Sequence, residues 1–319
     1  RSHSINWLFC KALNNKNNLT SSFKTLIDEL WPDGENGFYF PDMKGKKCYA
    51  PYEFKNKISS MNNLFEGVAA NDAKDLVNFV IMTLHEELNK PDNNENKKKN
   101  IANIDQRDKL KMFNIFVDNF KRENRSLISD LFYATNCNIT QCCGCGAQTF
   151  NYQTYFFLVF PLEEVRKKRY NNMNNNMVTI YDCFEYDKKV NIMSGINAMF
   201  CNYCKITCDC SMYTILSTGP QVLIILLNRG NGIQFNVKII FTENLDLSNY
   251  IVRKDTGYSY ELISVITHFG ESGMSGHFIA YCKDPISTTD WYKYIDSIVN
   301  KVDNFQKEVI NVGMPYLLF

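Results

Sequence analysis

The chain has 319 residues, of which 45% are hydrophobic and 14% aromatic, enough for a substantial packed core in one large domain or two ordinary ones. Lysine and arginine together number 35 and aspartate and glutamate 34, so no excess of charge favours nucleic acid or an anionic membrane as a partner. No apolar run approaches the length that a membrane-spanning helix needs.

The N-terminal segment and the cysteines indicate the compartment. Residues 1–10 contain neither a long apolar core nor a small-residue cleavage site, so no signal peptide is predicted. The first residue is Arg1 rather than methionine, which favours a fragment. The 12 cysteines are partly clustered, and without a secretory signal such clusters favour metal ligands over disulfides. We therefore expect a cytosolic or nuclear protein.

The first third of the chain is predicted to be helical. The strongest helical periodicity of apolar residues runs from Leu64 to Leu88, with Asp72 as a plausible N-cap and Pro91 as a terminator. A second helix is expected over residues 109–122. Asparagine-rich tracts are predicted to be loops or insertions, because they bury too little apolar surface to order themselves; they cover residues 14–18, 92–100 and 170–176.

Beyond residue 145 the pattern changes to short runs of β-branched, aromatic and aliphatic residues, which predict strands over residues 154–160, 222–227, 237–241 and 277–282. The run 222–227 is apolar throughout, as in a strand that is covered on both faces. A helical first part followed by a mostly β last part indicates an α+β fold.

Two Cys-x-x-Cys pairs lie far apart in the sequence, Cys142 with Cys145 and Cys201 with Cys204. Each pair suits a turn that presents two thiolates to one ion, and together they make a four-cysteine zinc site that would join two distant hairpins. Two unrelated groups of reduced cysteines are the alternative. A redox role is less favoured, because neither pair opens a helix after a strand. Three further thiols are close enough in sequence to be alternative ligands: Cys143, Cys208 and Cys210.

Among the four histidines, His277 has the most informative surroundings. It follows Gly276 at the end of a glycine-rich loop and opens an apolar strand, so a substrate backbone could approach a rigidly held imidazole. A carboxylate in the downstream segment 291–296 could fix its tautomer. A lone histidine on a strand is nevertheless more often structural. His85 is expected to be structural, on a solvated helix face.

Several segments, taken in order, resemble the ubiquitin-specific protease family. Residues 65–76 are similar to its Gln-Gln-Asp-Ala box, with Asp72 and Ala73 matching while Ala70 and Asn71 replace the two glutamines. The other similar segments are 126–132 before the first cysteine pair, 220–229 after the second, 276–281 for the Gly-His-Tyr box and 314–319 for the closing strand.

This resemblance implies one domain with a papain-like cysteine protease core over residues 1–319, made of a helical thumb (1–125), zinc-bearing fingers (126–230) and a palm of strands with the histidine box (231–319). It also implies thiol hydrolysis of the bond after the C-terminal glycine of ubiquitin, with His277 moving the protons. Zinc would be structural, on Cys142, Cys145, Cys201 and Cys204. Asp72 would contact the basic tail of ubiquitin, and Gly276 would lie beside it.

The chain departs from the family at the nucleophile. The family's box, Asn-x-Cys-aromatic-x-Asn-Ser, is not recognisable. Matching Ile5 and Asn6 to that box places His3 at the cysteine, and matching Ser4 to its serine places the cysteine before residue 1. Cys10 lacks matching neighbours. The chain as written is therefore expected to bind ubiquitin without cleaving it, for lack of the thiol.

A second departure concerns the partner of the histidine. Ile295 occupies the position where the family usually has aspartate or asparagine, and Asp296 follows immediately and could take over as the catalytic partner of His277. Adjacent residues of a strand point to opposite faces, so a strand through residue 296 would turn Asp296 away from the histidine. These departures leave two hypotheses open, an enzyme with an incomplete N-terminal record and a ubiquitin-binding pseudoenzyme that acts as an interaction module.

Overall fold

A computed structural model describes residues 18–30, 49–92, 105–170, 177–230, 236–272, 275–284, 287 and 289–319. These residues form two compact units. The first unit takes the described residues up to Pro91 together with Asn124–Ser129, and the second takes the described residues of Asp92–Glu123 and Asp130–Phe319. None of the described helices is long and apolar enough to cross a membrane.

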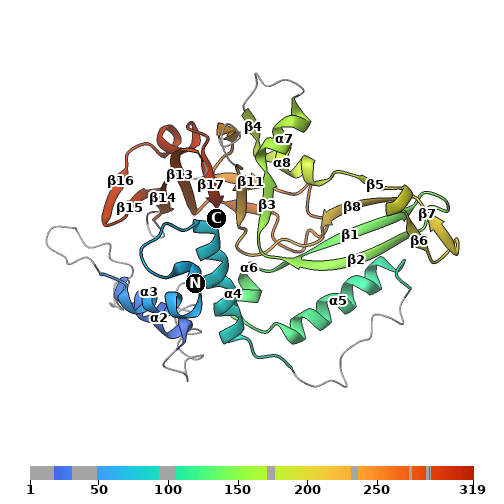
Figure 1. Cartoon of the computed structure of the whole chain (residues 1–319), viewed down its shortest axis with the longest axis horizontal. Coiled ribbons are helices and arrows are strands. Elements are labelled where there is room, and N and C mark those ends of the chain that lie inside the picture. Colours follow the sequence, from blue (N-terminus) through green and yellow to red (C-terminus); the bar gives the residue numbers. More distant parts are fainter. Residues whose placement is uncertain are drawn as a thin grey trace. The chain divides into compact units, whose positions relative to one another are not determined.

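The first unit is helical, as the sequence predicts (Figure 1). Its small core joins Leu19, Ile58 and Phe65. Glu87 accepts hydrogen bonds from the backbone N–H groups of Leu19 and Thr20 at 2.9 and 2.7 Å, so a carboxylate satisfies N–H groups that have no partner within the helix at the start of α2. The elements are α2 (Leu19–Leu30), α3 (Tyr52–Met61), the short η1 (Asn63–Phe65) and α4 (Ala73–Leu88).

Helix α4 confirms the predicted N-cap. Asp72 is extended, and its Oδ1 accepts a hydrogen bond from the backbone N–H of Lys74 at 2.9 Å. The helix begins only at Ala73, because the apolar residues before it belong to η1 and the following turn. It ends at Leu88, ahead of Pro91.

The prediction that His85 lies on a solvated helix face is wrong. The side chain is buried, with 8% of its surface exposed. Its Nδ1 lies 2.7 Å from Ser126 Oγ, and its Nε2 lies 3.1 Å from Asn124 Oδ1. His85 therefore links α4 to the segment 124–129, and its role is structural, as expected; the charged neighbours of its own helix gave no sign of this distant partner.

The second unit contains a four-stranded sheet covered by α5 (Lys109–Glu123), the predicted second helix (Figure 1). Met112 and Phe113 of α5 pack on Cys137, Ile139 and other buried side chains of the sheet. Its strand order is β2 (Gln148–Tyr155), β1 (Ala134–Cys142), β8 (Cys210–Leu216) and β5 (Asn191–Met193), all antiparallel. The small hairpin of β6 (Met199–Cys201) and β7 (Ile206–Cys208) lies near its far end.

A seven-stranded sheet forms the rest of the main core. The order is β16 (Ile298–Val302), β15 (Trp291–Ile295), β14 (Ser275–Lys283), β13 (Ser264–Ser272), β17 (Pro315–Leu318), β9 (Ile225–Asn228) and β3 (Leu158–Pro161). The predicted strand over residues 277–282 is confirmed as β14. The predicted strand over 154–160 is wrong as one piece, because β2 ends at Tyr155 and β3 begins at Leu158 in another sheet.

Residues 223–227 of the apolar run are all buried, as predicted, but strand β9 begins only at Ile225, so the predicted strand over 222–227 is confirmed only in its second half. The described part of the chain has further elements, some of which add buried side chains to this core. They are α6 (Leu127–Phe132), α7 (Leu162–Arg169), α8 (Ile180–Asp187), the parallel pair β4 (Met177–Thr179) and β10 (Lys238–Ile240), the hairpin β11 (Asn244–Asp246) and β12 (Ser259–Glu261), and the short helices Gly195–Asn197 and Gln306–Ile310.

A buried arginine, Arg229, holds the start of the C-terminal strand β17 by hydrogen bonds. Arg229 directly follows β9 and is 2% exposed. Its guanidinium donates to the carbonyl oxygens of Pro315 at 2.8 Å, Val237 at 2.5 Å and Gly313 at 3.5 Å. Burial lowers the pKa of Arg229 to about 10, because the charged form loses water. The side chain thus joins three separate chain segments.

Candidate catalytic and metal sites

The structure brings the two distant cysteine pairs together. The four sulfur atoms of Cys142, Cys145, Cys201 and Cys204 all lie within 4.8 Å of one another. The Sγ atoms of Cys142 and Cys204 are 3.8 Å apart, and so are those of Cys145 and Cys201. Four sulfurs placed tetrahedrally at about 2.3 Å from a zinc ion are separated by about 3.8 Å. The donor set therefore fits one structural zinc ion.

Turns at the ends of strands position these thiols. Cys142 ends β1 and Cys201 ends β6, while Cys145 and Cys204 lie in the turns that follow. Backbone N–H groups point at the sulfurs; that of Cys204 lies 3.4 Å from Cys201 Sγ. Hydrogen bonds from the backbone N–H groups of Cys145 and Gly144 lower the pKa of Cys142 to about 6, because they stabilise the thiolate that a metal requires.

A tyrosine ties this metal site to the segment before α5. The Tyr203 hydroxyl donates to Asp105 Oδ1 at 3.0 Å, and the guanidinium of Arg107 lies 4.3 Å from the Tyr203 ring centroid. Arg107 and Asp105 form an ion pair at 2.6 Å. The turn between Cys201 and Cys204 is therefore held from outside the cysteine pairs. Sequence analysis missed this contact, because residues 98 positions apart carry no local pattern that joins them.

On the seven-stranded sheet, His277 and Asp296 approach each other. The Nε2 atom of His277 lies 3.5 Å from Asp296 Oδ2, and the two side chains are 50% and 77% exposed. His277 is on β14, and Asp296 follows the neighbouring strand β15. The distance exceeds that of a good hydrogen bond and allows an ion pair when the imidazole is protonated.

The turn after β15 explains why strand alternation does not apply to Asp296. Ile295 pairs with Ile298, so Asp296 and Ser297 form a two-residue hairpin turn. Asp296 has φ +50°, a left-handed conformation that this type of turn requires and that aspartate tolerates. Leaving the strand at Ile295 allows Asp296 to approach His277, while Ile295 packs against the main hydrophobic core.

Gly276, directly before His277, lies against the neighbouring strand. A Cβ atom at Gly276 would lie 2.3 Å from Cε1 of His268 and 2.4 Å from the carbonyl oxygen of Phe269, both on β13. Neither distance is compatible with a real side chain. The glycine is therefore needed for the close packing of β13 on β14, in addition to any contact with substrate. His268 itself packs edge-on against Phe278, with 4.7 Å between ring centroids.

The other predicted site residues belong to the first unit or lie outside the described part. Asp72 belongs to the first unit, where its carboxylate caps α4 and pairs with Lys74 Nζ at 2.5 Å. The three positions considered for the nucleophile, namely His3, Cys10 and a site before residue 1, lie outside the described residues.

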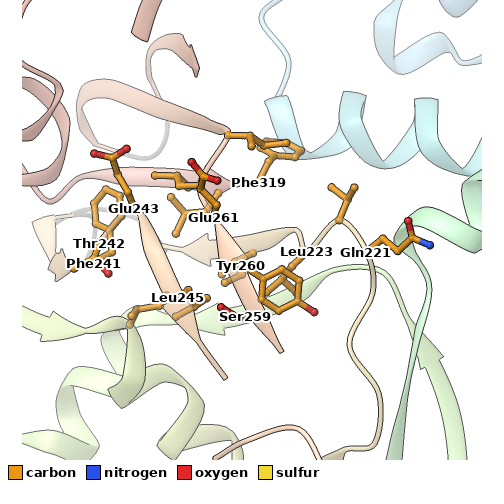
Figure 2. Close-up of a pocket in the computed structure, with 16 residues that line it drawn as sticks. Gln221, Leu223, Phe241, Thr242, Glu243, Leu245, Ser259, Tyr260, Glu261 and Phe319 are labelled. Carbon is orange, nitrogen blue, oxygen red and sulfur yellow. The ribbon is translucent and has the colours of Figure 1, made fainter. Parts of the chain in front are cut away.

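A separate pocket of about 200 Å³ lies beside β11 and β12 (Figure 2). Phe241, Tyr260 and Phe319 give it a largely apolar lining, with Glu243 and Glu261 also drawn around it. Neither His277 nor Asp296 lines this pocket. Lys283 pairs with Glu243 at 3.5 Å and Glu261 at 2.5 Å, so both carboxylates already have a cationic partner.

Comparison with known protein families decides the family. The model of the ubiquitin carboxyl-terminal hydrolase family matches residues 4–319. The chain belongs to this family. Its relatives are named ubiquitin carboxyl-terminal hydrolases, and the family resemblance seen in the sequence is confirmed.

Curated relatives agree with the family match. Ubiquitin carboxyl-terminal hydrolase 2 of Gallus gallus is 27% identical over 94% of this chain and 79% of its own length. The Homo sapiens protein of that name is 25% identical over 100% of this chain and 50% of its own length, and the Bos taurus protein is 25% identical over 94% and 46%. The chain thus spans about half the length of the two mammalian relatives.

Solved structures share the fold. A chain of the SAGA DUB module Ubp8/Sgf11/Sus1/Sgf73 bound to monoubiquitin matches with a TM-score of 0.69 and 18% identity, over 99% of this chain and 62% of that chain. A chain of the same module bound to ubiquitin aldehyde matches with a TM-score of 0.67 and 18% identity, over the same shares. Together with the family match, this likeness confirms the α+β class and the papain-like protease core.

Proposed function

We propose that this chain grips ubiquitin and belongs to an enzyme that hydrolyses the bond after the C-terminal glycine of ubiquitin. The observation that carries the proposal is the placement of His277 beside Asp296, in a chain of this family. The solved structures that share the fold are bound to ubiquitin or ubiquitin aldehyde, which supports ubiquitin as the partner.

In this proposal His277 is the general base. Asp296 lies on the Nε2 side of the imidazole, which leaves Nδ1 as the nitrogen that can exchange a proton with a thiol. His277 takes the thiol proton as the sulfur attacks the carbonyl carbon, and then gives a proton to the leaving amine. Water hydrolyses the resulting thioester, and His277 accepts a proton from that water. The thiol itself comes from outside the described residues.

The rest of the chain would hold the substrate. The helical thumb (1–125), the zinc-bearing fingers (126–230) and the palm (231–319) would grip the globular body of ubiquitin and its extended tail. The zinc on its four cysteines stabilises the ends of the fingers and takes no part in the reaction. The tail would reach His277 past Gly276, whose side-chain position is already filled by His268 and Phe269 of β13.

A ubiquitin probe with a C-terminal electrophile tests this function. We expect the chain to bind ubiquitin without forming an adduct, and His3→Cys, or extension before Arg1 by a cysteine box of the family's form, to yield a covalent adduct. An adduct with the unchanged chain that is lost in Cys10→Ser would instead make Cys10 the nucleophile. No measurable binding of ubiquitin by calorimetry would contradict the proposal as a whole.

Asp72 offers a separate test of the grip on the ubiquitin tail. Asp72→Ala is expected to weaken ubiquitin binding by about 10- to 100-fold, since a charge-assisted hydrogen bond to an arginine is worth about 1.5–3 kcal/mol. The same change removes the cap of α4, at a cost of about 1 kcal/mol. Asp72→Asn keeps a capping side chain and loses the charge. Weak binding in both variants supports the tail contact, whereas wild-type affinity in Asp72→Asn would leave only the cap.

A further inference from the structure

A fifth thiol reaches the zinc-binding cluster. A Cβ atom placed on Gly144 would lie 3.6 Å from Cys208 Sγ and 3.7 Å from the Sγ atoms of both Cys142 and Cys204. Three sulfurs therefore surround one point on the turn of the first cysteine pair. Cys208 does not belong to the compact set of four ligands. It lies on the side of the cluster where Cys142 and Cys204 meet.

The backbone explains why Cys208 points to the cluster. In the β6–β7 hairpin Cys201 pairs with Ile206, so their side chains share one face. Cys208 is two residues beyond Ile206 on the same strand and returns to that face. The N–H of Cys143 donates to the carbonyl of Asp209 at 2.8 Å, which holds the residues after Cys208 against the first cysteine turn.

We propose that Cys208 is a reserve zinc ligand that can replace Cys204 as the fourth thiolate of the site. In the exchange Cys208 loses its proton to solvent and bonds to the metal, while the released Cys204 takes up a proton, so charge and protons balance. Cys204 is the ligand exchanged because its Sγ and that of Cys208 lie beside the same point at Gly144, and because it is only half-buried in the hairpin turn. Cys142 is buried at the end of β1, which fixes it more firmly.

Two further cysteines near the cluster, Cys143 and Cys210, differ from Cys208 in their surroundings. Cys143 is exposed, and Cys210 is buried with its Sγ 3.5 Å from the Cys208 carbonyl. The Sγ atom of Cys210 is not among the three atoms nearest to the Gly144 position, where Cys208, Cys142 and Cys204 meet. With Cys208 as a second possible ligand, the metal site would keep four thiolates when the turn of the β6–β7 hairpin moves Cys204 away.

Cobalt substitution measures the number of thiolates directly, because sulfur-to-cobalt charge-transfer absorption grows with each bond. We expect Cys204→Ser to retain one metal per chain and the full four-thiolate absorption. Adding Cys208→Ser should lower that absorption to about three quarters, the value for three thiolates, and should speed the loss of zinc to a chromophoric chelator. Adding Cys143→Ser instead should change neither quantity. Equal absorption with and without Cys208 in the Cys204→Ser background would overturn the proposal.

A measurement on the unchanged chain covers the case in which Cys204→Ser fails to fold. Zinc-loaded protein is treated briefly with an alkylating agent, and the modified cysteines are mapped by mass spectrometry. Exchange between the two thiols predicts comparable modification of Cys204 and Cys208, well above that of Cys201. Protection of Cys204 equal to that of Cys201, with Cys208 fully modified, would show a fixed ligand set and overturn the proposal.

Discussion

Replacing His277 by alanine is expected to lower hydrolysis of a ubiquitin substrate by on the order of 10³-fold, in a chain supplied with the nucleophile through His3→Cys or an upstream cysteine box. General acid–base catalysis by one positioned imidazole contributes rate effects of about that size. The expected loss is in kcat, because His277 acts on protons that move during the reaction while the grip on ubiquitin is made elsewhere. Ubiquitin affinity, measured separately by calorimetry, should stay within a few-fold.

Two variants of Asp296 distinguish the effect of its negative charge from the effect of an oxygen acceptor at that position. Asp296→Ala is expected to reduce turnover by up to about fivefold, less than a buried triad carboxylate would, because exposed ion pairs contribute only about 0.2–1 kcal/mol and Asp296 is 77% exposed. Asp296→Asn keeps an oxygen acceptor and the tolerance for a positive φ, so it should retain most of the activity. Equal turnover in the wild type and in Asp296→Ala would remove Asp296 from the catalytic site.

The family's usual residue at position 295 should not restore activity. Ile295 packs against the main core, so Ile295→Asp would place a carboxylate in an apolar environment. We expect Ile295→Asp to destabilise the seven-stranded sheet and to leave turnover no higher than before. An increase in kcat in this variant would show that the histidine is reached from the strand rather than from the turn.

What could be predicted from the sequence was local or carried by a family pattern. The N-cap at Asp72 and the strand through His277 follow from neighbouring residues alone. The meeting of Cys142 with Cys204 follows from the chemistry of two thiol pairs that need one ion. Asp296 was expected as the partner of His277, but the geometry of its approach depends on a positive φ in a turn, which strand alternation does not predict.

Contacts between distant segments escaped prediction for a common reason. The burial of His85 depends on Asn124 and Ser126, and the support of the metal site depends on Tyr203 meeting Asp105. A single sequence contains no periodicity that pairs such positions. Arg229 is the strongest case, since an arginine that ends an apolar run suggests an exposed strand end and the structure buries it.

Removing the buried guanidinium of Arg229 is expected to cost about 3–5 kcal/mol of unfolding free energy, among the largest effects of any single substitution in the second unit. In Arg229→Met the carbonyl groups of Pro315, Val237 and Gly313 lose their donor inside the protein, and each unsatisfied buried group costs about 1–3 kcal/mol. Relief of the cost of burying the cation offsets part of that loss.

The loss would reach His277 through the sheet. The carbonyl of Pro315 belongs to β17, which lies between β9 and β13, and β13 pairs with the strand that carries His277. Urea denaturation followed by fluorescence measures the effect, with Trp7→Phe and Trp31→Phe in the background so that Trp291, stacked on Phe305, reports alone. Arg253→Met is the matched control: this arginine is 36% exposed and pairs with Asp255, so its loss should cost under about 1 kcal/mol. Equal midpoints for the two variants would show that the carbonyls at Arg229 find other donors, and that the arginine does not anchor the C-terminal strand.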